Sequence, residues 1–208
     1  MIKFSASMMI IFFLPACNIS EENPVAKSKD TSAIFEHHNI ANPLSSVDKS
    51  PMDISYFPAD YPKLKMTGQD KNPPIARIIY SRPFKDGRKI FGALQKYGEV
   101  WRMGANEATE IEFFRDVTIH QKKIAAGRYI LYCIPHENKW TIVLNNDLFT
   151  WGLKIDSSKD ILRTDIPVEK VATPFEALTI VFEEAKDGAN LIIAWDDIKA
   201  SLPVSFNK

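Results

Sequence analysis

Short stretches of alternating apolar and polar residues, separated by turn residues, are the feature that most constrains the fold of this chain. Residues 109–113 place Thr109, Ile111 and Phe113 on one face of a strand and two glutamates on the other. Residues 128–134 are apolar on both faces, which is typical of a strand in the middle of a sheet. Long helical periodicity is absent from the sequence, so an all-β fold is predicted.

Further predicted strands follow one another at short spacings. They cover residues 75–81, 117–119, 140–144, 161–168, 178–182, 189–195 and 198–204. We expect Pro167 to interrupt one strand, and tight turns at residues 186–188 and 196–197 to separate the last three. Roughly eight to ten short strands with such turn signals indicate a single antiparallel β-sandwich or open barrel.

The N-terminus has the features of a bacterial export signal. Lys3 is its only charge, and the apolar run over residues 8–14 is too short to span a bilayer but suits a secretory signal. Residues 14–17, Leu-Pro-Ala-Cys, resemble a lipobox, where the signal is cut before a cysteine that becomes acylated. We therefore expect removal of residues 1–16 and attachment of diacylglycerol and palmitate-like chains to Cys17. The alternative is an ordinary secretory signal with an incidental cysteine.

This signal predicts a cell-envelope lipoprotein held to a membrane by its acyl chains. Asn18 stands where an aspartate would serve as an inner-membrane retention cue, so we expect an outer-membrane lipoprotein facing the periplasm or the surface. Residues 17–50 are polar and aperiodic after the cysteine, which predicts a flexible linker. Residues 51–208 form the predicted β domain, starting with a proline- and aromatic-rich extended segment over residues 51–62.

The residues with the most distinctive chemistry lie between Tyr80 and Glu110, where four of the eight glycines also fall. Guanidinium groups bind carboxylates in a planar fork, a tryptophan face stacks on an apolar sugar face, and asparagine both donates and accepts hydrogen bonds. These properties suit a glycan or another polar small molecule. The candidate ligand-binding residues are Arg82, Arg88, Trp101, Arg102, Asn106 and Glu107.

Each candidate also has a purely structural interpretation. An arginine here could form a salt bridge that pins its loop, the tryptophan could belong to the core, and the turn before Thr109 could be closed by its own hydrogen bonds. A third hypothesis is therefore a structural or assembly lipoprotein without a small ligand. The chain could also be a hydrolase that uses Glu107 or Glu110 as acid or base, but a strand that starts at Thr109 would make these two carboxylates diverge.

Composition and motifs exclude several other classes. Lysine plus arginine and aspartate plus glutamate both number 26, which argues against a nucleic-acid binder. The sequence lacks zinc-hydrolase, paired-cysteine, nucleophile-elbow and phosphate-loop motifs, so we predict neither a cofactor nor a metal site. The remaining metal alternative is His37 and His38 with a carboxylate. Cys133 lies in an apolar strand and is predicted to be a buried, inert thiol.

The same central stretch carries a family resemblance. Its motifs fall at residues 80–83, 87–92, 97–102 and 104–109 and continue at 116–119, 126–129, 140–142 and 194–196. Together they resemble an uncharacterised bacterial family, domain-of-unknown-function family 2911, from about residue 50 to the C-terminus. The resemblance implies a secreted or lipoprotein context and a β-rich domain. It implies no activity and no catalytic residue.

Overall fold

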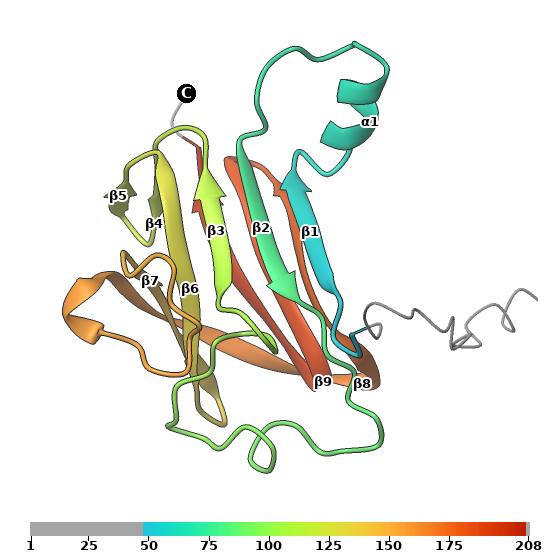
Figure 1. Cartoon of the computed structure of the whole chain (residues 1–208), viewed down its shortest axis with the longest axis vertical. Coiled ribbons are helices and arrows are strands. Elements are labelled where there is room, and N and C mark those ends of the chain that lie inside the picture. Colours follow the sequence, from blue (N-terminus) through green and yellow to red (C-terminus); the bar gives the residue numbers. More distant parts are fainter. Residues whose placement is uncertain (1–47, 207–208) are drawn as a thin grey trace, which may run out of the picture. The chain divides into compact units, whose positions relative to one another are not determined.

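The computed structural model describes residues 48–206, so the predicted signal, Cys17 and most of the predicted linker lie outside the described residues. Within this range the chain forms nine strands, one short α-helix and one 3₁₀ turn (Figure 1). In chain order they are β1 (Met52–Phe57), α1 (Tyr61–Met66), β2 (Ala76–Ser81), β3 (Thr109–Phe113), β4 (Val117–Ile119), β5 (Lys122–Ile124), β6 (Gly127–Pro135), β7 (Lys139–Asn145), η2 (Ser157–Lys159), β8 (Asp160–Ala185) and β9 (Gly188–Ser205).

All strands belong to one open antiparallel sheet in the order β1-β2-β3-β6-β7-β8-β9-β4-β5. The first part of β8 pairs with β7 and the second part pairs with β9. The sheet therefore folds over along β8, and Figure 1 shows β8 and β9 behind β1, β2 and β3. Contacts between the layers agree, because the Phe57 and Phe182 rings lie 6.2 Å apart and the Ile180 N–H donates to the Tyr80 hydroxyl at 3.0 Å. The predicted all-β antiparallel architecture is confirmed.

The hydrophobic core lies between these two layers. Ile78 of β2, Ile111 of β3, Ile180 of β8 and Ile193 of β9 are completely buried. They occupy the alternating apolar positions from which the strands are predicted, because successive side chains of a strand point to opposite faces. Burial on both faces holds for β6, as expected from its continuous apolar sequence.

The proline- and aromatic-rich segment forms the edge of the sheet. It is extended over β1, as predicted. It does not remain extended to residue 62, because the short helix α1 begins at Tyr61. Tyr56 and Tyr61 pack with their ring centroids 5.3 Å apart, which joins the helix to the strand. None of the helices among residues 48–206 is both long and apolar enough to cross a bilayer.

Two expected chain breaks are wrong. Pro167 does not interrupt its strand, because it lies where β8 leaves β7 and Val168 begins to pair with β9, so its missing N–H falls at the end of a ladder. Asp196 does not form a tight turn either. It has φ +52° and lies in continuous β9 opposite Phe175, and the extra residues of the two register shifts that flank this pair lie in β8, at 171–174 and 176–178.

Candidate functional site

The loop after β2 is fastened to the opposite layer of the sandwich. The Lys85 N–H donates to the Glu176 carbonyl at 2.7 Å, and the Lys85 ammonium pairs with Asp196 at 2.9 Å. The second carboxylate oxygen of buried Asp196 accepts the Ile90 N–H at 3.0 Å. Burial opposes ionisation of Asp196, but the bonds from Ile90 and Lys85 outweigh it and hold the pKa of this carboxyl below its ordinary value. This half of the central stretch is a closed structural network.

The two candidate arginines of this loop donate to the protein itself. Arg82 pairs with Asp53 at 3.1 Å and donates to the Thr179 hydroxyl at 3.1 Å. Arg88 donates from Nε to the Lys85 carbonyl at 2.8 Å and from Nη2 to the preceding carbonyl at 2.6 Å. Their donors therefore hold β1, β2, β8 and the loop together. Arg82 thus forms a salt bridge within the protein, whereas the exposed Arg88 forms none with residues 48–206 and bonds two carbonyls of its own loop.

Trp101 belongs to an aromatic cluster in the core. It is 5% exposed and lies against Phe91 at 5.4 Å, Trp140 at 5.6 Å and Trp195 at 6.0 Å between ring centroids. Its backbone exchanges two hydrogen bonds with Cys133 of β6, at 2.7 and 2.9 Å. No face of this ring is open to a ligand, so the structure places Trp101 with the core residues.

Asn106 and Glu107, the last two candidates, line an open cavity of about 290 Å³. The complete lining is Asp48, Ser50, Met52, Asn106, Glu107 and Trp151. Asn106 has φ +57°, a left-handed conformation that asparagine tolerates better than most residues. Its amide donates to the Asp48 carboxylate at 2.8 Å and to the Ser50 carbonyl at 3.5 Å, which holds the entry to β1 against the 104–107 turn.

Arg102 lies against Gly152, in the loop that contributes Trp151 to the cavity lining. A Cβ added at Gly152 would lie 3.0 Å from Arg102 Cβ and 3.1 Å from Ala108 Cβ, and Gly152 has φ +81°. Glycine is therefore required at this close approach. The Arg102 Nη1 atom is buried without a hydrogen-bond partner. Arg102 thus supports the loop, while Trp151 forms the cavity wall.

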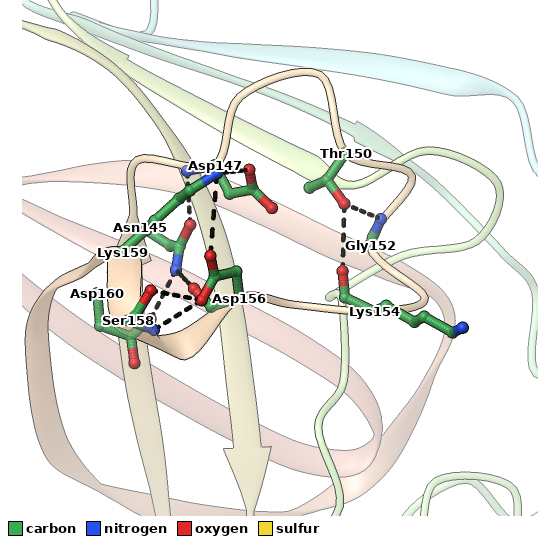
Figure 2. Close-up of polar contacts among 9 residues, drawn as sticks. All are labelled: Asn145, Asp147, Thr150, Gly152, Lys154, Asp156, Ser158, Lys159 and Asp160. Carbon is green, nitrogen blue, oxygen red and sulfur yellow. Dashed lines mark hydrogen bonds and ion pairs between the residues drawn. The ribbon is translucent and has the colours of Figure 1, made fainter.

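The loop from residue 146 to residue 156 is held by a polar network at its base (Figure 2). Buried Asn145 donates to the Asp156 carbonyl at 2.9 Å and accepts the Asp147 N–H at 2.6 Å. Lys159 pairs with Asp147 at 2.5 Å, and this hydrogen bond raises the pKa of the Lys159 ammonium. Nearer the tip, the Thr150 hydroxyl bonds the Lys154 carbonyl and accepts the Gly152 N–H, each at 3.3 Å.

A second layer of contacts lies under that network. The hydroxyl of buried Tyr132 donates to the Asp160 carboxylate, whose two oxygens lie at 2.8 and 2.9 Å. Burial, followed by this bond to a carboxylate, raises the pKa of Tyr132 to about 12. Asp160 also accepts from Asn145 at 2.8 Å and from Arg163 at 2.9 Å. The loop therefore stands on a hydrogen-bonded base anchored in β6 and β8.

The two carboxylates considered as an acid or base, Glu107 and Glu110, face different parts of the surface. Glu107 is exposed and lines the open cavity, whereas Glu110 pairs with Arg128 at 3.5 Å. Glu110 lines a separate crevice with Arg77 and Glu112. The divergence follows from the start of β3 at Thr109, as the alternating sequence predicts. The pair therefore does not converge on one space.

Cys133 is a free, fully buried thiol, as predicted from its apolar strand. Burial raises its pKa well above the ordinary value, which disfavours the nucleophilic thiolate. Between residues 48 and 206, no three histidine, cysteine, aspartate or glutamate side chains are grouped so that they could hold a metal ion. His37 and His38 lie outside the described residues.

Sequence reasoning missed Trp151 and the three residues that precede or begin β1. Trp151 could have been found, since it lies with Phe149 and Leu153 between the predicted strands at residues 140–144 and 161–168, where large apolar residues have no strand to pack on. The contributions of Asp48, Ser50 and Met52 depend on how the start of β1 meets a turn more than 50 residues away in sequence. No local pattern announces such a contact.

The fold and this geometry define the class as an antiparallel β-sandwich domain with an open, mixed polar and aromatic cavity at one end of its first strands. Residues 62–204 match the family described as protein of unknown function, DUF2911, and the chain belongs to this family. No curated protein and no solved structure matches the chain.

Proposed function

We propose that this chain is a cell-envelope lipoprotein, anchored through Cys17, whose β domain binds a hydroxyl-rich ligand of the saccharide class. The observation that carries the ligand proposal is the cavity in which the half-exposed Trp151 ring stands beside the Asn106 amide and the Glu107 carboxylate. The sequence features that support anchoring are the short apolar signal and the Leu-Pro-Ala-Cys motif at residues 14–17.

The cavity has the two components that saccharide recognition needs. Trp151 offers an apolar ring face on which the C–H face of a sugar can lie, and it costs little side-chain entropy to order. The Glu107 carboxylate and the side-chain carbonyl of Asn106 add acceptors for hydroxyls, and the bonds of the Asn106 amide to Asp48 and Ser50 fix the orientation of that carbonyl. The volume of about 290 Å³ suits one or two sugar rings, because small-ligand pockets start at about this size.

The ligand proposal is tested with a glycan array that spans neutral and acidic oligosaccharides, followed by titration of the best binder. We expect Trp151→Ala to weaken binding by about tenfold or more, as removal of a central aromatic anchor usually does. Tyr97→Ala is the matched control, since Tyr97 is an exposed aromatic residue outside the cavity lining. Equal binding by the wild type and the Trp151 variant, or an array without any binder, would overturn the proposal.

Anchoring is tested separately by mass spectrometry of the N-terminal peptide and by labelling with an alkyne analogue of palmitate. We expect an acylated Cys17 at the mature N-terminus, and loss of the label in Cys17→Ser. An unacylated mature chain that starts elsewhere would show an ordinary secretory signal. That result would leave the ligand proposal standing.

A further inference from the structure

The loop at residues 148–155 exposes an unusual amount of apolar surface. Phe149 is 86% exposed, Leu153 75% and Trp151 54%. Lys154 is the only charged residue in this segment, and no acidic residue occurs in it. A soluble surface normally scatters such residues singly, whereas a concentration of them marks an interaction site.

The loop holds these side chains outward despite a conformational cost. Phe149 has φ +69°, a left-handed conformation that is unusual for a bulky aromatic residue. The Arg128 guanidinium lies 5.1 Å from the centre of its ring, which braces the ring from the sheet side. Together with the hydrogen bonds from Thr150 and the network around Asn145, these contacts fix the exposed arrangement instead of letting the loop collapse onto the sheet. Strain that surrounding contacts maintain is characteristic of functional segments.

We propose that the tip of this loop inserts Phe149 and Leu153 into the interfacial region of a lipid bilayer and holds Trp151, which lies between them in sequence and lines the cavity, at the headgroup level. Phenylalanine and leucine reach the acyl boundary, tryptophan prefers the headgroup level, and the long lysine stem lets the Lys154 ammonium stay in water. The absence of acidic side chains from residues 148–155 removes the charge that such insertion would penalise most.

A bilayer, rather than a protein, is the favoured occupant because of where the described chain begins. Asp48 and Ser50 line the same cavity as Trp151, so the segment leading back to Cys17 joins the domain beside this loop. Residues 18–47 span at most about 100 Å when fully extended, so an acylated Cys17 would limit the distance between the entry of the chain at Asp48 and the membrane to about that length. This step rests on the anchoring part of the proposed function, and tethering lets even weak insertion be populated.

The four tryptophans make the test unusually direct. Trp101, Trp140 and Trp195 are at most 5% exposed, so Trp151 alone among them can meet a quencher located in lipid. The full-length acylated chain is reconstituted into phosphatidylcholine vesicles, with and without acyl chains brominated near the headgroup. We expect brominated lipid to quench the emission of Trp151, and Trp151→Phe to remove the quenchable component.

Insertion is then separated from anchoring by charge-introducing variants. Phe149→Asp and Leu153→Asp should lose the quenching while the acylated chain still floats with the vesicles. Val100→Asp is the control, because Val100 is a half-exposed apolar residue in a different loop, and it should be quenched like the wild type. Near-ultraviolet circular dichroism checks that each variant remains folded.

Each outcome bears on the inference. Flotation without any quenching of Trp151 would overturn it while anchoring stands, and would leave a protein partner as the occupant of the loop. Equal quenching in the Phe149 and Leu153 variants would also overturn it. If the chain proves unacylated, anchoring fails, and the same unacylated chain is added to preformed vesicles at high lipid concentration. Quenching there supports insertion by the loop alone, and its absence refutes it.

Discussion

Two regions of this domain are rich in residues that resemble a binding site, and the structure uses them in opposite ways. Residues 82–101 contain two arginines, a lysine and a tryptophan whose polar or aromatic groups are engaged within the protein. The cavity, lined by Asp48, Ser50, Met52, Asn106, Glu107 and Trp151, leaves the exposed Glu107 carboxylate and the half-exposed Trp151 ring open. Residues 82–101 contain more of the residue types that suggest binding in a sequence, but only the second region surrounds an open cavity.

The difference follows from how each region meets the sandwich. Residues 82–90 run across to the opposite layer, so Lys85 pairs with Asp196 of β9 and Arg82 donates to Thr179 of β8, whereas Arg88 bonds carbonyls of its own loop. The cavity lies where three chain segments end against each other, at the start of β1, before β3 and after β7. Open surface arises there because the segments meet at their ends. The packed polar groups of this domain therefore belong to its structural network, and the open cavity is the part for which we propose a ligand.

The largest effect on the free energy of unfolding should come from replacing, one at a time, the tryptophan of each region by alanine. Trp101→Ala should lower the free energy of unfolding by about 3–5 kcal/mol, since it removes a buried ring from an aromatic cluster. Trp151→Ala should change that free energy by no more than about 0.5 kcal/mol, because its ring is half exposed. Urea unfolding of both variants measures this. A small effect of Trp101→Ala, or equal effects of the two, would remove the basis of the comparison.

A smaller effect, with a characteristic pH dependence, is expected at Asp196. Asp196→Asn should cost about 1–3 kcal/mol at neutral pH, because Lys85 keeps its charge but loses its carboxylate partner. The pKa of Asp196 is lowered in the folded state, so its contribution is present above the unfolded value of about 3.9 and is lost as pH falls through the folded pKa. The difference between wild type and variant should therefore shrink below about pH 4.

The measurement is the free energy of unfolding of both proteins at neutral and at acidic pH. Asp187→Asn is the control, since Asp187 is an exposed aspartate in the β8–β9 turn, and its effect should be small throughout. A difference between wild type and Asp196→Asn that stays constant down to strongly acidic pH would show that the carboxylate charge contributes nothing there.

Much of the fold could be predicted from sequence because it depends on local patterns. The alternation of Thr109, Ile111 and Phe113 is fixed by strand geometry, and the hairpin ending at Gly188 follows from its turn residues. Pro167 and Asp196 were misjudged because both signal a break in isolation. Pro167 fits in its strand because β8 changes its pairing partner there from β7 to β9. Asp196 fits in β9 because it pairs with Lys85, which lies more than 100 residues away in sequence.

The candidate site was less predictable for the same physical reason. Asn106 and Glu107 could be named from residue type, and the structure does place them at a cavity. Trp101 and Trp151 are both tryptophans in segments without a strand pattern. Only the packing of Phe91, Trp140 and Trp195 around Trp101 distinguishes them. Sequence chemistry therefore identified candidates, whereas tertiary packing decided which of them remain accessible.

The smallest stability effects should distinguish the two regions most sharply. Arg88→Ala removes an exposed guanidinium whose two carbonyl acceptors can bond water instead, so we expect a change within about 0.5 kcal/mol. Asn106→Gly removes the amide but keeps a residue that accepts φ +57°, so its stability change should be similarly small. Asn106→Ala is the less suitable variant, since the left-handed conformation adds about 1–2 kcal/mol of strain.

These two variants should then differ in binding of the saccharide that the array selects. Arg88→Ala should bind as the wild type does, because its side chain is directed to the carbonyls of its own loop. Asn106→Gly should bind several-fold more weakly, because a hydrogen bond to a ligand hydroxyl contributes about 0.5–1.5 kcal/mol. Calorimetric titration of both variants under identical conditions makes the comparison. Weaker binding by Arg88→Ala, with binding by Asn106→Gly unchanged, would show that the ligand binds to residues 82–101 and not in the cavity. Because both variants should be as stable as the wild type, unfolding could not explain the weaker binding.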